Sequence, residues 1–137
     1  MTRSDFQQLA GVRIDEANVL FAAKKWSGAY YLAGYAVECA LKACIAKLTK
    51  ADDFPPQNTN RDYYTHDIKT LIRTARLDAV RIADGSTNLS LEAYWNVVEL
   101  WSEQSRYNSK SELEARDLLK AVDDPTDGVL QWIRQHW

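Results

Sequence analysis

Hydrophobic residues recur every three or four positions along most of the chain, which is the spacing of one face of an α-helix. Almost no stretch shows the strict alternation of apolar and polar residues that a half-buried strand requires. The pattern predicts five helices, over about 4–25, 28–47, 67–77, 89–104 and 110–122, and a short helical segment over 127–136 after Pro125. Between them, 51–66 is predicted to be a long loop and 83–88, ADGSTN, a turn. The predicted fold is therefore an all-α, up-and-down bundle of about five helices, forming one domain over 1–137.

Polar residues beside two predicted helices suggest where those helices begin. Ser4, followed by Asp5, is the predicted N-cap of the first helix. Thr65 or Asp67 is expected to cap the helix over 67–77.

The stretch 28–47, GAYYLAGYAVECALKACIAK, is apolar around nearly its whole circumference except at Glu38 and Lys42. Its length approaches that of a membrane span, but two opposite charges at its centre make insertion into a membrane costly. We therefore expect the central helix of a bundle, surrounded by its neighbours.

Composition narrows the class of protein. A hydrophobic content of 46% suffices for a real core, and 17 basic against 19 acidic residues argues against wholesale electrostatic wrapping of nucleic acid, although a local basic face remains open. The N-terminal residues show no secretory signal, so a cytoplasmic protein is expected. Cys39 and Cys44 are too far apart around the helix to pair with each other and have no metal-binding companions. We expect buried, reduced thiols, and neither a metal nor a cofactor.

Glu38 and Lys42 stand four residues apart, the favourable order for an ion pair within a helix. Tyr31 and Tyr35 fall on the same stripe of that helix. We expect this polar line to meet Arg106, after the helix over 89–104, with His66 as a further candidate partner. Two interpretations are open: an internal ion-pair lock that fixes the helix register, or part of a nucleotide or RNA pocket.

Two further sets of residues carry candidate chemistry. Arg61 and His66 have four residues between them, so that His66 could act as general base or acid on a 2′-hydroxyl while Arg61 stabilises the negative charge of the phosphorane. Three basic residues follow one helix face and form either a phosphate-contacting row or an ordinary solvated face: Lys69, Arg73 and Arg76. Tyrosines and tryptophans crowd the C-terminal half, and any left exposed would mark a dimer or partner surface.

Three motifs together resemble the HEPN family (higher eukaryotes and prokaryotes nucleotide-binding domain). They are the helix YYLAGYAVECALKACIA, which contains Tyr31, Ala33, Glu38, Leu41, Lys42 and Ala43; the helix opening THDIKTLI, over 65–72; and the pair Arg106 and Tyr107. The resemblance implies a helical bundle that is commonly homodimeric. It also implies a setting beside a minimal nucleotidyltransferase or within a toxin–antitoxin or defence system. Many members are metal-independent ribonucleases with an Arg-x(4–6)-His motif, whereas others lack it and act as binding partners or scaffolds.

The expected function is thus a HEPN-type binding module associated with a nucleotide or RNA, homodimeric, and a partner of a minimal nucleotidyltransferase. One alternative is a metal-independent RNA endonuclease that uses Arg61 and His66, and a second is a structural dimer adaptor. The candidate ligand-binding residues, which could equally form only a polar seam, are Tyr31, Glu38, Lys42, Arg106 and Tyr107.

Overall fold

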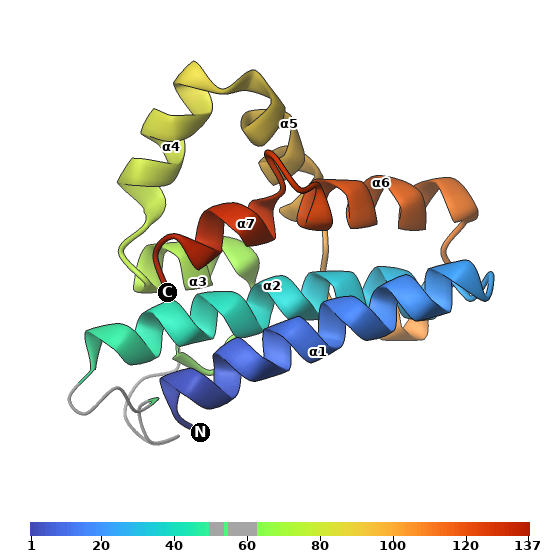
Figure 1. The fold of residues 1–137 in the computed structure, drawn as a ribbon, viewed down its shortest axis with the longest axis horizontal. Helices are drawn as coiled ribbons and strands as arrows, with labels where there is room; N and C mark the ends of the chain where they lie inside the picture. The colour runs from blue at the N-terminus through green and yellow to red at the C-terminus, as the bar shows by residue number, and fades with distance from the viewer. Residues whose placement is uncertain (50–53, 55–62) are drawn as a thin grey trace.

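The computed structural model describes residues 1–49, 54 and 63–137, and these residues form helices and no β-strand (Figure 1). The all-α prediction is therefore confirmed. Most of the predicted loop 51–66 lies outside the described residues. The helices are α1 (Arg3–Ala22), α2 (Trp26–Leu48), α3 (Ile68–Thr74), α4 (Asp78–Thr87), α5 (Leu89–Val98), the 3-10 helix η3 (Glu103–Tyr107), α6 (Glu112–Asp123) and α7 (Val129–Arg134).

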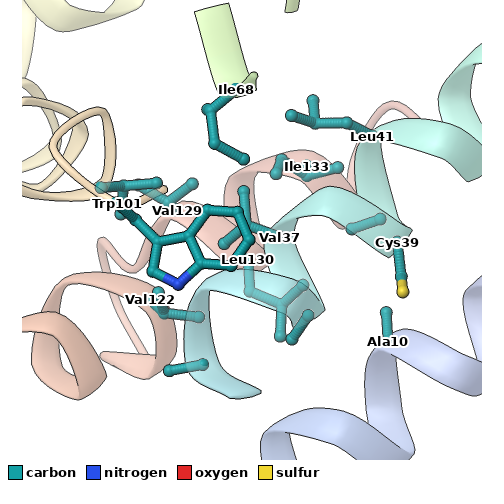
Figure 2. Packing of buried hydrophobic residues seen from close by; sticks show 14 of the residues in the cluster. Ala10, Val37, Cys39, Leu41, Ile68, Trp101, Val122, Val129, Leu130 and Ile133 are labelled. Carbon is teal, nitrogen blue, oxygen red and sulfur yellow. The ribbon is translucent and has the colours of Figure 1, made fainter. Parts of the chain in front are cut away.

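Helix α2 is the centre of the bundle, as its apolar circumference predicted. It packs against α1 along one side and against α6, α7, α3 and η3 on others, as Figure 1 shows. Six alanines and Gly34 are among its buried residues, so the neighbouring helices can approach it closely. In Figure 2, Ala10 of α1 faces Cys39 of α2, while Leu41, Ile68 and Ile133 converge from α2, α3 and α7.

Helix α1 begins at Arg3, one residue earlier than predicted, and its N-cap is Thr2 and not Ser4. The Thr2 hydroxyl accepts a hydrogen bond from the Asp5 backbone N–H at 3.1 Å, and the Asp5 carboxylate accepts one from the Thr2 N–H at 2.8 Å. Together these two bonds form a reciprocal capping box between Thr2 and Asp5. At the start of α3, Asp67 is confirmed as the cap.

The predicted turn at 83–88 is wrong: most of it is the second half of helix α4. The sequence pattern predicted a turn because a glycine, here Gly85, destabilises the interior of a helix. Here the glycine lets α4 and α5 pack closely, since a Cβ at position 85 would lie 2.1 Å from the Glu92 carboxylate. Asn88 then ends α4 and caps α5, accepting from the Leu91 N–H at 3.1 Å. The described residues therefore contain seven α-helices where about five were predicted.

The buried core contains three aromatic side chains of the C-terminal half, Trp95, Trp101 and Trp132, while Tyr94 and Trp137 pack against it partly buried. Cys39 and Cys44 are free and buried, also as predicted. Burial raises the pKa of each thiol to about 12. No helix in the described part of the chain has the length and apolar character needed to cross a membrane.

Candidate functional site

The carboxylate of Glu38 lies in the interior of the bundle, where the residue is only 1% exposed. It is reached from its own helix by Lys42, whose Nζ lies 3.3 Å from Oε2. From outside the helix it is reached by His66, whose Nδ1 lies 3.0 Å from Oε1 and 3.1 Å from Oε2. A buried carboxylate is stable only with such partners, and here it has two.

His66 holds a second carboxylate with its other ring nitrogen. Its Nε2 lies 3.1 Å from Oε2 of Glu103, the first residue of η3. The imidazole therefore bridges α2 and η3, and we refer to Glu38, His66 and Glu103 as the histidine clasp. Nδ1 is within hydrogen-bond distance of the Glu38 carboxylate, whereas the contact of Nε2 with Glu103 is at ion-pair distance and is an ion pair only when the ring is protonated.

Local backbone structure fixes where His66 stands. The preceding Thr65 accepts from the Asp67 N–H through its hydroxyl at 3.1 Å. Asp67 in turn caps α3, and its carboxylate accepts from the Thr70 N–H at 3.0 Å and from the Thr70 hydroxyl at 2.7 Å. His66 is thus held between two side-chain-stabilised turns at the entry to α3, which orients its ring toward α2.

The clasp opens onto a hollow of about 330 Å³ on the surface. The residues that line it come from the entry to α3 and from the segment that leads into η3: Thr65, His66, Asp67, Trp101, Ser102, Glu103 and Gln104. Two buried polar atoms of this same segment, Nε1 of Trp101 and Oγ of Ser105, have no hydrogen-bond partner among the described residues. The hollow is therefore polar and partly acidic, and the segment behind it holds two buried polar atoms without a partner among the described residues.

Aromatic side chains of helix α2 pack against Trp101, one of the residues that line the hollow. Tyr31 stacks on Tyr35 and on Trp101, each with ring centroids 6.0 Å apart. Trp101 lies so close to α2 that a Cβ at Gly34 would come within 2.3 Å of its indole. At Tyr31 and Tyr35, the polar line predicted for α2 is therefore an aromatic stack. This stack positions Trp101.

Lys42 faces away from open solvent and is only 9% exposed. Its ammonium lies 5.7 Å from the ring centroid of Phe54, a cation–π contact. Phe54 packs in turn against Phe6 of α1, with ring centroids 5.1 Å apart. Lys42 is enclosed between Glu38 and this aromatic cover, so it balances the charge of Glu38 and is not positioned to reach a ligand in the hollow.

The expected meeting of Glu38 with Arg106 is wrong. Among the described residues, the ion pairs of Glu38 are those with Lys42 and His66. Arg106 is exposed, with its guanidinium 4.8 Å from the ring centroid of Tyr107, which is itself 70% exposed. The reason is that α5 ends at Val98 and the chain continues as the 3-10 helix η3, which turns Glu103 inward in place of Arg106.

Arg106 nevertheless lies close to the outer part of the clasp. Arg106 follows Glu103 by three residues in η3, and no ion pair joins the two side chains. The neighbouring groups that raise the pKa of the Arg106 guanidinium are Tyr107 first, then Glu103 and Tyr31. Arg106, which was expected to contact Glu38 in the interior, therefore lies at the surface of the protein.

The remaining predicted site residues are placed apart from the clasp or fall outside the described chain. Arg61 lies outside the described residues. Lys69, Arg73 and Arg76 are exposed on and just after α3, the arrangement of a solvated face. The next basic residue, Arg81, does not extend their row, because it is buried and paired with two carboxylates of α5 and its end, at 3.0 and 3.1 Å.

The described part of the chain contains no group of three or more His, Cys, Asp or Glu side chains arranged to hold a metal ion. The chain matches no protein-family model, no curated protein and no solved structure. The resemblance to HEPN domains thus rests on the three motifs, and function must be argued from the histidine clasp.

Proposed function

We propose that this protein is a nucleotide- or RNA-associated binding module of the HEPN type, with the histidine clasp and its hollow as the ligand site. The observation that supports the proposal is the position of His66, which is held by a buried carboxylate on one side and is 43% exposed in its side chain on the other. A polar side chain that is fixed by a buried contact and is also exposed to solvent can bind a ligand without rearranging first.

The same geometry favours binding over cleavage. A general base needs a ring nitrogen with a free lone pair within reach of the hydroxyl that it activates. Nδ1 of His66 lies 3.0 Å from Glu38 and Nε2 lies 3.1 Å from Glu103, so neither nitrogen offers a free lone pair, whereas the exposed face of the ring remains available for contact with a ligand. This is the physical reason to rank the binding module above a ribonuclease that would use His66 with Arg61.

The proposed setting is a homodimer that accompanies a minimal nucleotidyltransferase in a toxin–antitoxin or defence system. The support for this part is the motif resemblance, together with one surface feature. Tyr107 is 70% exposed with Arg106 over its ring, and an exposed aromatic and arginine pair is typical of a recognition surface.

A binding titration with a His66→Gln variant tests the proposal. The probe is a short fluorescent RNA with a 5′-hydroxyl end, followed by anisotropy. We expect the wild-type protein to bind it and His66→Gln to bind it at least about tenfold more weakly, a typical loss for a central polar contact. His136→Gln is the matched control, since His136 packs on Trp132, with ring centroids 4.4 Å apart, and lines no part of the hollow.

Two results would redirect the assignment. RNA cleavage by the purified protein in EDTA, lost in both His66→Ala and Arg61→Ala, would establish the metal-independent endonuclease. Absence of RNA binding in a protein that elutes as a dimer from size-exclusion chromatography would establish the structural adaptor.

A further inference from the structure

The two contacts of the histidine clasp depend differently on the charge of its imidazole. Nδ1 of His66 lies within hydrogen-bond distance of both carboxylate oxygens of Glu38, at 3.0 and 3.1 Å. A neutral ring that carries its proton on Nδ1 keeps this contact. Nε2 lies 3.1 Å from Oε2 of Glu103, and this contact is attractive only when Nε2 is protonated as well. Loss of one proton from the ring therefore spares the inner contact and removes the outer one.

The two carboxylates also differ in their freedom to move. The Glu38 side chain is 2% exposed, and Lys42 holds it from the same helix at 3.3 Å. The Glu103 side chain is 27% exposed and belongs to η3, a 3-10 helix of five residues. When the ring is neutral, the lone pair of Nε2 faces the Glu103 carboxylate, and two acceptors at this distance repel each other. Glu103 can relieve the repulsion by turning into water, whereas Glu38 would have to leave Lys42.

We propose that the clasp is a pH-dependent catch, in which protonation of His66 fastens η3 to the entry of α3 and deprotonation releases Glu103. Histidine is the side chain that ordinarily changes its charge between about pH 5 and 8. Because Glu103 is one of the residues that line the hollow, the pH then determines whether this wall of the hollow is fixed. The catch operates in the free protein, so it does not depend on whether the hollow binds RNA.

Charged side chains around the ring come from three described elements. They are Glu38 and Lys42 of α2, Glu103 and Arg106 of η3, and Asp67 at the entry to α3. Lys42 balances Glu38, and the Asp67 carboxylate is engaged as the cap of α3. Arg106 forms no ion pair with Glu103. Among these groups, Glu103 is therefore the carboxylate whose position depends on the charge of His66.

The release is expected to be confined to the start of η3. Trp101, just before η3, is held on α2, because its indole lies against Gly34 and stacks on Tyr31. Ser102 caps η3 by accepting from the Gln104 N–H at 3.2 Å, a bond within the turn that does not tie the turn to another helix. Releasing Glu103 therefore frees residues 102–104 while Trp101 stays in place.

Backbone ¹⁵N relaxation measured at about pH 5.5 and about pH 8.5 tests the catch. An ordinary glutamate loses its proton near about pH 4.3, so the side chains that ordinarily titrate in this range are the histidines, of which the chain has 2. We expect the amides of residues 102–104 to have order parameters of about 0.85 at the lower pH and below about 0.6 at the higher pH.

Glu103→Gln is the central variant, because an amide can accept from a protonated Nε2 and donate to a neutral one. It is expected to keep residues 102–104 ordered at both pH values. His66→Gln is expected to remove the pH dependence as well, since it has no titrating ring. His136→Gln is the matched control, because His136 packs on Trp132, with ring centroids 4.4 Å apart, and lines no part of the hollow. Burial lowers the pKa of His136, and its replacement is expected to leave the loss of order unchanged.

Three results would overturn the catch. The first is equal order of residues 102–104 at both pH values in the wild-type protein. The second is a loss of order at the higher pH that persists in Glu103→Gln or His66→Gln, and the third is a loss that disappears in His136→Gln. Far-ultraviolet circular dichroism checks that each variant is folded. If His66→Gln does not fold, Glu103→Gln decides the test, because it changes a partly exposed side chain.

Discussion

Replacing Glu38 by glutamine removes the carboxylate that Lys42 and His66 both contact. The Nζ of Lys42 lies 3.3 Å from the carboxylate, and at an effective dielectric constant of about 20 this attraction amounts to about 5 kcal/mol. Part of it is offset, because an amide costs less to bury than a carboxylate. Breaking one side of a buried ion pair typically costs about 3–5 kcal/mol, and we expect a loss in that range. Since a domain of this kind is stable by about 5–15 kcal/mol, the variant would lose a large share of its stability.

A double substitution separates the charge imbalance from a general disturbance of α2. Glu38→Leu with Lys42→Met removes both buried charges and keeps the volume of the interior similar. Such replacements are often neutral, so the double variant is expected to recover most of the stability that Glu38→Gln loses. His66 then retains Glu103 and its own access to water, with 43% of its side chain exposed.

Urea unfolding followed by far-ultraviolet circular dichroism measures these free energies. The control is Glu112→Gln, whose partner Arg116 is 56% exposed in its side chain, and its loss is expected to stay below about 0.5 kcal/mol. A loss below about 1 kcal/mol in Glu38→Gln, or a double variant no more stable than the single one, would refute the reasoning that Glu38 balances Lys42.

Three further substitutions or reactions test other features. Gly34→Ala places a Cβ within 2.3 Å of the Trp101 indole, so it is expected to cost about 1–3 kcal/mol in urea unfolding despite the higher helix propensity of alanine; an unchanged midpoint would contradict this. Arg76→Gly relieves a left-handed backbone, with φ 60°, and is expected to raise stability by about 1 kcal/mol, which a lowered melting temperature would disprove. The pKa values of Cys39 and Cys44 are raised to about 12, so at about pH 8 the fraction of each present as thiolate is on the order of 10⁻⁴. Neither cysteine is therefore expected to react with a disulfide reagent until the protein is unfolded. Rapid labelling of the folded protein would show that the thiols are accessible.

The fold was predictable from sequence where the apolar pattern was strong. Helix α2 was recognisable as the central helix because its residues are apolar on every side and it is in fact surrounded. Helix α4 was missed because Gly85, taken alone, indicates a break. Its actual role is to make room for Glu92 of the next helix, a tertiary contact that local propensity does not contain.

The inner half of the clasp was also predictable, and the outer half was not. Glu38 and Lys42 were conspicuous as charges in an apolar helix, and His66 was a named candidate partner. Glu103 carried no signal, because which residue of η3 faces inward depends on where α5 ends and on the 3-10 geometry that follows. The same geometry explains why Arg106, expected at Glu38, lies at the surface.

The long sequence separation across the clasp has a consequence for the kinetics of folding. His66 and Glu38 are 28 residues apart, whereas α1 and α2 are joined by a short turn and form the most extensive contact among the described helices. Contacts between adjacent helices close quickly, and those that must close long loops form late. We therefore expect the clasp to form late in folding, and a substitution of His66 to raise the rate of unfolding more than it lowers the rate of folding.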